Sequence, residues 1–149
     1  MTDETTFLPR LNHVAFTMDR SLLDDAGRAE IKDFYGDVFG WTEGANSMES
    51  GNPLILYTGE FAQFVYLLPG DDPMVCPRLD HFGFQVATKV ELEDIVARAK
   101  SRQATDDRVS IIDVKSRLTH GEASEYELTS AYIGFVLPFM VELQHIGKR

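Results

Sequence analysis

The chain has 149 residues, of which 44% are hydrophobic and 26% charged, enough material for the core of one globular domain. Its formal net charge of -10 repels phosphate backbones, so we expect no nucleic acid partner. The single cysteine, Cys76, excludes an internal disulfide. The N-terminus MTDETTFLPR does not show the basic start and apolar core of a signal peptide, and the longest apolar run is too short to span a membrane. We therefore expect a cytoplasmic protein.

The first half of the chain begins with an alternating strand. Over residues 11–18 apolar and polar residues alternate, which predicts a strand with His13 on one face. A helix follows, because apolar residues recur at three- and four-residue spacing over 31–38, and Gly40 then ends it. The remaining elements predicted in this half are strands over residues 53–58 and 61–68, joined by a hairpin turn.

A linker separates the two halves. Residues 69–77, PGDDPMVCP, hold three prolines, a glycine and two aspartates, and hydrophobic periodicity stops there. The order then restarts with a strand over 80–86 and a helix that begins with a capping box of Thr88 and Glu91. The last predicted elements are strands at 109–114, within 126–136, and at 139–145.

The second half repeats the first. LNHVAF at residues 11–16 matches LDHFGF at 79–84, and FVYL at 64–67 matches MVEL at 140–143. Two modules of βαβββ order explain this repeat. We therefore predict a single domain over 1–149, with module one at about 8–68, a linker at about 69–78 and module two at about 79–147.

Two histidines and a glutamate are candidate metal ligands. If a pseudo-twofold axis relates the modules, His13 and His81 converge from their first strands, and Glu142 in an otherwise apolar strand lies on the matching face. A single histidine on a strand usually has a structural role. A buried carboxylate such as that of Glu142 is costly without a cation or a hydrogen-bond partner, and a metal ion is one such partner. Two imidazoles and one carboxylate bind Fe(II), Mn(II), Ni(II) or Zn(II) and leave coordination positions open. The set predicts one divalent metal ion as cofactor.

Four segments resemble the vicinal oxygen chelate superfamily: NHVAF, DFYGDVFGW at 33–41, DHFGF and MVELQ. This superfamily includes glyoxalase I, extradiol dioxygenases, fosfomycin-resistance thiol transferases and metal-free bleomycin-binding proteins. The resemblance covers residues 11–145 in order. It implies an α+β fold in which paired βαβββ modules form a curved, mixed eight-stranded sheet, with helices on the convex side. It also implies metal ligands at His13, His81 and Glu142 on the concave face.

Two tyrosines are candidate catalytic residues. Glyoxalase I has a glutamate at the place of Tyr66, so its absence here favours three protein ligands. Tyr132 precedes Glu142 by ten residues, the interval found in extradiol enzymes, although either tyrosine also suits a merely structural role. We expect the substrate-binding side chains to be Gln85, Gln144, Phe64 and Met140.

Other features of extradiol dioxygenases and of fosfomycin-resistance enzymes are missing. His120 lies several residues too early for the catalytic histidine of extradiol enzymes. No basic cluster for a phosphonate is evident; Lys115, Arg117 and His120 come near one, but a solvated strand edge or loop is the expected setting for them.

These observations predict a metal-dependent enzyme whose small substrate chelates the metal through vicinal oxygens. It would be a glyoxalase- or dioxygenase-like lyase, isomerase or ring-cleaving oxygenase. Iron favours the dioxygenase, and nickel or zinc the isomerase or lyase. The alternative is a metal-free protein that sequesters a small molecule, as bleomycin-resistance proteins do. In some relatives the site lies between two chains, so a homodimer is expected, and loops at 43–52 and 119–124 are expected to select the substrate.

Overall fold

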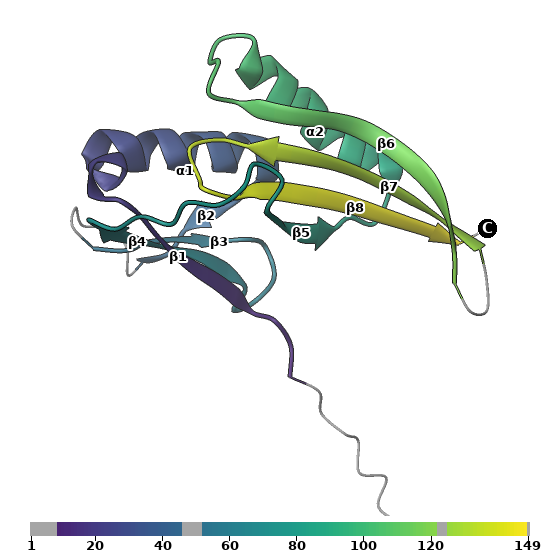
Figure 1. Cartoon of the computed structure of the whole chain (residues 1–149), viewed down its shortest axis with the longest axis horizontal. Coiled ribbons are helices and arrows are strands. Elements are labelled where there is room, and N and C mark those ends of the chain that lie inside the picture. The colour runs from purple at the N-terminus through teal and green to yellow at the C-terminus, as the bar shows by residue number, and fades with distance from the viewer. Residues whose placement is uncertain (1–8, 46–51, 122–124, 149) are drawn as a thin grey trace, which may run out of the picture.

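The structure is a computed structural model that describes residues 9–45, 52–121 and 125–148 (Figure 1). The segment at 1–8, which bears on the expected lack of a signal peptide, lies outside these ranges. So do 46–51 and 122–124 of the two loops expected to select the substrate. No helix in the described ranges is long and apolar enough to cross a membrane.

In the part of the first module that the structure describes there are four strands and one long helix. Its elements are β1 (His13–Asp19), the 3-10 helix η1 (Arg20–Leu23), α1 (Asp25–Phe39), β2 (Thr42–Glu43), β3 (Leu54–Tyr57) and β4 (Phe64–Gly70). Asp24 caps α1 by accepting a hydrogen bond from the Gly27 amide, and Gly40 ends it as predicted, in the left-handed conformation at φ 75°. The strand order is β1-β4-β3-β2, with β1 parallel to β4 and the other pairs antiparallel.

The second module repeats this order. Its elements are β5 (His81–Gln85), α2 (Lys89–Gln103), β6 (Ser110–His120), β7 (Glu125–Gly134) and β8 (Met140–Lys148). The predicted capping box of Thr88 and Glu91 begins α2. The strand order is β5-β8-β7-β6, with β5 parallel to β8. Strand β6 runs six residues beyond the expected end at residue 114, because its pairing with β7 resumes after an irregularity and continues to His120.

The strand registers of the two modules are equivalent. The histidine that begins β1 lies opposite Phe64, and the histidine that begins β5 lies opposite Met140. Two residues further on, Tyr66 and Glu142 occupy equivalent places. This confirms the internal repeat and the predicted α+β fold of paired βαβββ modules. The eight strands of the described ranges form two hydrogen-bonded sheets of four, and α1 and α2 lie on the same side of these sheets (Figure 1).

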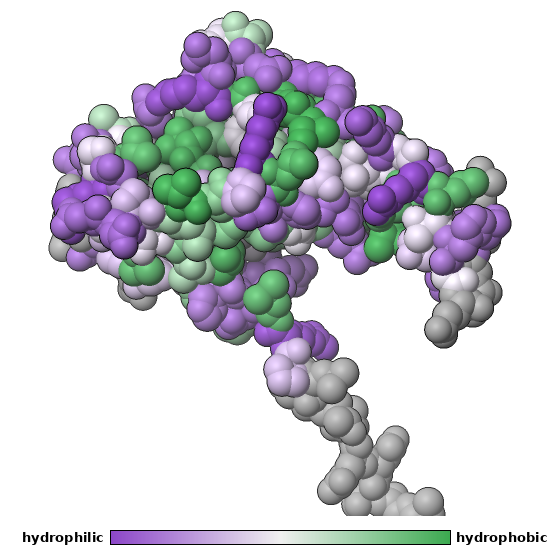
Figure 2. All heavy atoms as spheres, viewed as in Figure 1, coloured by the Kyte–Doolittle hydropathy of each residue, from purple (hydrophilic) through white to green (hydrophobic). Residues whose placement is uncertain are grey.

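The modules pack through the sides of their sheets that face the helices. The rings of Phe34 in α1 and Phe135 stack with centroids 4.3 Å apart, and the rings of Trp41 and Phe84 lie 5.5 Å apart. The buried Tyr35 hydroxyl donates a 2.9 Å hydrogen bond to the carbonyl of Phe135. One apolar core therefore includes residues of both modules. Figure 2 shows apolar side chains gathered over the middle of the molecule, with hydrophilic side chains around them.

This packing leaves the opposite side of each sheet uncovered by helices. We name these sides the open faces. The open face of the first sheet carries His13, Phe64 and Tyr66, and that of the second carries His81, Tyr132 and Glu142.

The hydrogen bond of Tyr35 joins the two modules, and its removal is expected to destabilise the fold. Tyr35→Phe keeps the ring packing and removes only the buried donor, so we expect the free energy of unfolding to fall by about 1 kcal/mol. Urea unfolding measures this change. Tyr57→Phe is the matched control, because the Tyr57 side chain is 39% exposed. Equal stability of both variants would show that the contact between the modules does not depend on this bond.

Candidate functional site

A histidine and a glutamate meet on the open face of the second sheet. The Oε2 atom of Glu142 lies 3.3 Å from Nε2 of His81, and the Glu142 side chain is only 7% exposed. Glu142 lies opposite Gly83 of β5, where an added Cβ would stand 3.4 Å from Oε2. A Cβ at this place would touch the carboxylate, so the glycine leaves the space beside it free.

Tyr132 lies opposite Glu142 on the neighbouring strand β7. Its ring meets the His81 ring edge-on at a centroid distance of 5.0 Å. Burial, followed by the hydrogen bond to the Glu142 carboxylate, raises the pKa of Tyr132, while a hydrogen bond from Ser130 and the charge of Arg117 act in the opposite direction. The hydroxyl therefore stays protonated at neutral pH and donates to Glu142. The catalytic role of Tyr132 stays a prediction.

The hydrogen bonds of His81 determine which of its nitrogens is available. Nδ1 lies 2.7 Å from the carbonyl oxygen of Leu79, which can only accept, so Nδ1 carries the hydrogen. Nε2 faces Glu142 and has two options. It carries a second proton and pairs with the carboxylate, or it offers its lone pair to a cation held between the two side chains. Metal-binding histidines commonly show this arrangement, with the distal nitrogen fixed by a backbone carbonyl.

His13 repeats the arrangement on the open face of the first sheet. Its Nδ1 lies 2.7 Å from Oδ1 of Asn12, and its ring stacks on Phe64 at a centroid distance of 4.9 Å and an interplanar angle of 5°. An amide oxygen accepts, so Nδ1 again carries the hydrogen and Nε2 is the available nitrogen. The two histidines thus share a tautomer as well as a position in the repeat.

The three predicted ligands do not form one cluster within a single chain. Within the described ranges, no group of three histidine, cysteine, aspartate or glutamate side chains is placed to hold a metal ion. The arrangement brings together His81 and Glu142 and leaves His13 on the other sheet. The physical reason is that the modules of one chain meet through their helix sides rather than their open faces.

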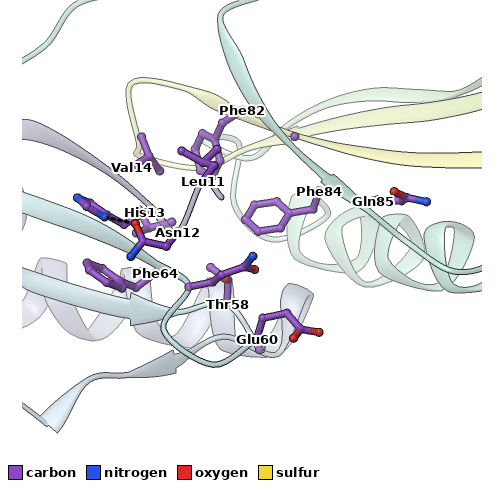
Figure 3. Close-up of a pocket in the computed structure, with 14 residues that line it drawn as sticks. Leu11, Asn12, His13, Val14, Thr58, Glu60, Phe64, Phe82, Phe84 and Gln85 are labelled. Carbon is purple, nitrogen blue, oxygen red and sulfur yellow. Dashed lines mark hydrogen bonds between the residues drawn. The ribbon is translucent and has the colours of Figure 1, made fainter. Parts of the chain in front are cut away.

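A cavity of about 470 Å³ lies between the modules, beside the start of β1 and residues 82–85 of β5 (Figure 3). Its walls include His13 and Phe64 from the first module and Phe84 and Gln85 from the second. Figure 3 shows His13 and Gln85 at opposite ends of the cavity. The Thr58 hydroxyl, also in the lining, is buried without a hydrogen-bond partner. The volume is in the range of small-molecule sites.

The other predicted site residues divide between the sheets. Half-buried Tyr66 lies on β4 with its ring centroid 6.4 Å from that of Phe64, next to His13 rather than Glu142. Met140 lies opposite His81, and Gln144 opposite Gln85. His120 ends β6, where it is exposed and 3.2 Å from a carboxylate oxygen of Glu125. No contact between described residues connects His120 with His81 or Glu142.

Sequence reasoning missed three residues that shape these sites. Asn12 orients His13, and its place directly before the histidine was the available signal. The space that Gly83 leaves beside Glu142 depends on strand register, and so does the place of the hydrogen bond between Ser130 and Tyr132 beside Glu142. Strand register cannot be read from the sequence.

No protein-family model matches the chain, and comparison with curated protein sequences finds no match. Solved structures do match. The fosfomycin resistance protein FosX from Listeria monocytogenes, in a variant complexed with Mn(II) and 1S,2S-dihydroxypropylphosphonic acid, has a TM-score of 0.60 at 14% identity over 93% of each chain. An integron cassette protein from the mobile metagenome of a Halifax Harbour sewage outfall has a TM-score of 0.58 at 19% identity, over 93% of this chain and 99% of that one.

A third similar structure is lactoylglutathione lyase from Agrobacterium tumefaciens. It has a TM-score of 0.54 at 19% identity, over 91% of this chain and 92% of that one. These neighbours are members of the vicinal oxygen chelate superfamily. Identities this low establish similarity of fold and leave the activity open. The chain therefore has the vicinal oxygen chelate fold, as the resemblance of its sequence motifs implied.

Proposed function

We propose that the protein is a metal-dependent enzyme of the vicinal oxygen chelate type. The observation that carries this proposal is the pair of His81 and Glu142. Nε2 of His81 lies 3.3 Å from Oε2 of Glu142, whose carboxylate is buried. Because Nδ1 of His81 is held by a backbone carbonyl, Nε2 is oriented as a metal ligand.

The donor set suits a divalent transition metal. Two imidazole nitrogens and one carboxylate oxygen are the ligands that Fe(II), Mn(II), Ni(II) and Zn(II) accept in catalytic sites, with positions left for substrate. His81 and Glu142 supply two of these ligands from neighbouring strands of one sheet. His13, whose Nδ1 is also occupied, is the proposed third ligand.

A second copy of the chain is the proposed source of His13. One chain carries one candidate ligand on the open face of its first sheet and two on that of its second. Helix-side packing keeps these faces from meeting within the chain. In a symmetric homodimer, the first module of each copy would cover the second module of the other and complete two identical sites.

The proposed substrate is a small molecule that chelates the metal through two neighbouring oxygens. FosX binds Mn(II) and a vicinal diol, and another neighbour is named a lyase, which supports this substrate class here. The metal, when bound, would act as a Lewis acid and stabilise negative charge on a substrate oxygen. Tyr132 would orient Glu142 through its hydroxyl, and Gln85 and Gln144 would contact the substrate. Lyase, isomerase and ring-cleaving oxygenase activities all fit this site.

Metal binding tests the proposal directly. Protein purified without chelator is analysed for transition metals and then titrated with Mn(II) by calorimetry. We expect about one ion per chain, the value for a site built from three side chains. Less than about a tenth of an equivalent after titration would contradict a metal-dependent function, since three correctly placed ligands bind Mn(II) measurably.

The cavity between the modules supports a second candidate, metal-free sequestration of a small molecule. Its lining contains Phe64, Phe82 and Phe84 but neither His81 nor Glu142. If the protein sequesters small molecules without a metal, the His81→Ala variant should bind bleomycin as tightly as the wild type does. If the substitution abolished both bleomycin binding and Mn(II) binding, this candidate would be wrong.

A further inference from the structure

Strand β6 contains a β-bulge beside the proposed site. Ile112 pairs with Tyr132, and the next pair is Lys115 with Ser130, so β6 advances three residues where β7 advances two. The extra residue lies within 113–114. Such bulges reverse the faces on which the following side chains point, and they often do so beside functional sites.

The bulge places two basic residues on the open face of the second sheet. Regular pairing would put Val114 opposite Ser130 and direct Lys115 toward the helix side. Instead, Val114 packs against the core, and the Ser116 hydroxyl lies 2.8 Å from that of buried Thr129 on the helix side. Lys115 and Arg117 are therefore on the face that carries Tyr132 and Glu142.

Strand register arranges this face in rows. One row contains Glu142 and Tyr132. The next row crosses all four strands and consists of Gln85, Gln144, Ser130 and Lys115. Arg117 lies opposite Leu128, one row further. Rows on one face are about 7 Å apart and strands about 5 Å apart, so the backbone of Lys115 lies about 12 Å and that of Arg117 about 17 Å from that of Glu142. Their long side chains and a substrate with two functional ends can span these distances.

These two cations form no ion pair with any other described residue, in a chain of net charge -10. Other charged groups on β6 are paired: Asp113 lies 2.6 Å from Lys100, and His120 lies 3.2 Å from Glu125. The register of β6 and β7 places both unpaired positive charges on the same face as the proposed metal ligand Glu142.

We propose that Lys115 and Arg117 bind an anionic group of the substrate. The substrate is then an organic acid with two ends: vicinal oxygens that chelate the metal, and a carboxylate or phosphate that reaches the basic pair. Gln144 and Ser130 lie between the two ends and offer hydrogen bonds to the connecting part. This inference rests on the proposed function for the chelating end only, because the anion subsite consists of different residues.

The competing explanation is that β6 is an edge strand and its lysine prevents pairing with other chains. Edge protection would not require both cations on the face of Glu142, and it predicts no anion affinity. The experiment therefore compares an anionic chelator with a neutral one.

The test uses the full chain loaded with Mn(II), with 3,4-dihydroxybenzoate and catechol as probes. Both probes chelate through neighbouring hydroxyls, and only the first carries a carboxylate. We expect the double variant Lys115→Gln/Arg117→Gln to bind Mn(II) and catechol as the wild type does. Its affinity for dihydroxybenzoate should fall about 10- to 100-fold, because charge-assisted hydrogen bonds are lost.

The control variant is Lys89→Gln/Lys100→Gln, which removes the same charge from α2 of the same module. It should leave the affinity for both probes unchanged. Equal dihydroxybenzoate affinity in the wild type and the Lys115/Arg117 variant overturns the proposal, and so does an equal loss in the control.

A metal-free arm keeps the anion subsite testable if the proposed function fails. Chelator-treated protein is titrated with inorganic phosphate, and the amide signals of Lys115 and Ser130 are followed by NMR. Shifts in the wild type that disappear in the double variant support the subsite. No shift in the wild type overturns it, whatever the Mn(II) titration shows.

Discussion

Glu142→Gln is expected to weaken Mn(II) binding by at least about 100-fold. Changes to residues that merely support a ligand cost about 10- to 100-fold in metal affinity, so loss of a ligand should cost no less. Glutamine keeps the volume of the side chain and an oxygen that can accept from Tyr132, so the buried site is expected to stay packed. Calorimetric titration with Mn(II) measures the change.

Thermal unfolding supplies a second readout of the same substitution. Ligand that binds only the folded state raises the melting temperature, so Mn(II) should stabilise the wild type and not the variant. Glu125→Gln is the control, because Glu125 is an exposed glutamate of the same sheet, paired with His120. If Glu142→Gln kept wild-type Mn(II) affinity, Glu142 would not be a ligand.

Two variants that each lose metal binding should restore it when they are combined in one dimer. His13→Ala damages the first module, and Glu142→Ala damages the second. If each site takes its first module from one copy and its second module from the other, a mixed dimer has one intact site and one site with both defects. We expect the mixed dimer, co-expressed with two tags, to bind Mn(II) at about half the wild-type stoichiometry.

The control combines His81→Ala with Glu142→Ala, which both damage the second module. No site in that mixed dimer is intact, so no binding should return. Restoration by the first pair and not by the second would identify a site shared between two copies. If the first pair also stayed inactive, a site built from two copies would be wrong, even if single chains bound metal.

The elements of the fold could be predicted from local patterns. Gly40 ended α1 because a left-handed residue is needed there, and Thr88 with Glu91 began α2 because their side chains satisfy free amides. The repeat of NHVAF and DHFGF aligned the modules correctly, as the registers of Phe64 and Met140 show. The full extent of β6 was missed, because a bulge interrupts its alternation.

The candidate site could be predicted only in part. Strand parity correctly placed His81 and Glu142 on one face, and the structure brings them within 3.3 Å. The convergence of His13 with them was expected from pseudosymmetry, and within one chain it does not occur. Pseudosymmetry relates equivalent residues of the two modules. It does not determine whether the open face of the first module meets that of the second in the same chain or in another copy.

The sequence by itself determined most of the elements, the helix ends at Gly40 and Thr88, the duplication and the face on which each proposed ligand lies, because these follow from local sequence patterns. Only the tertiary structure decided two other matters. The stacking of Phe34 on Phe135 and the bond of Tyr35 hold the modules of one chain together through their helix sides, so His13 is kept apart from Glu142. The bulge in β6 moved Lys115 and Arg117 onto the face of Glu142. Both depend on contacts between segments distant in the chain, and no local pattern records them.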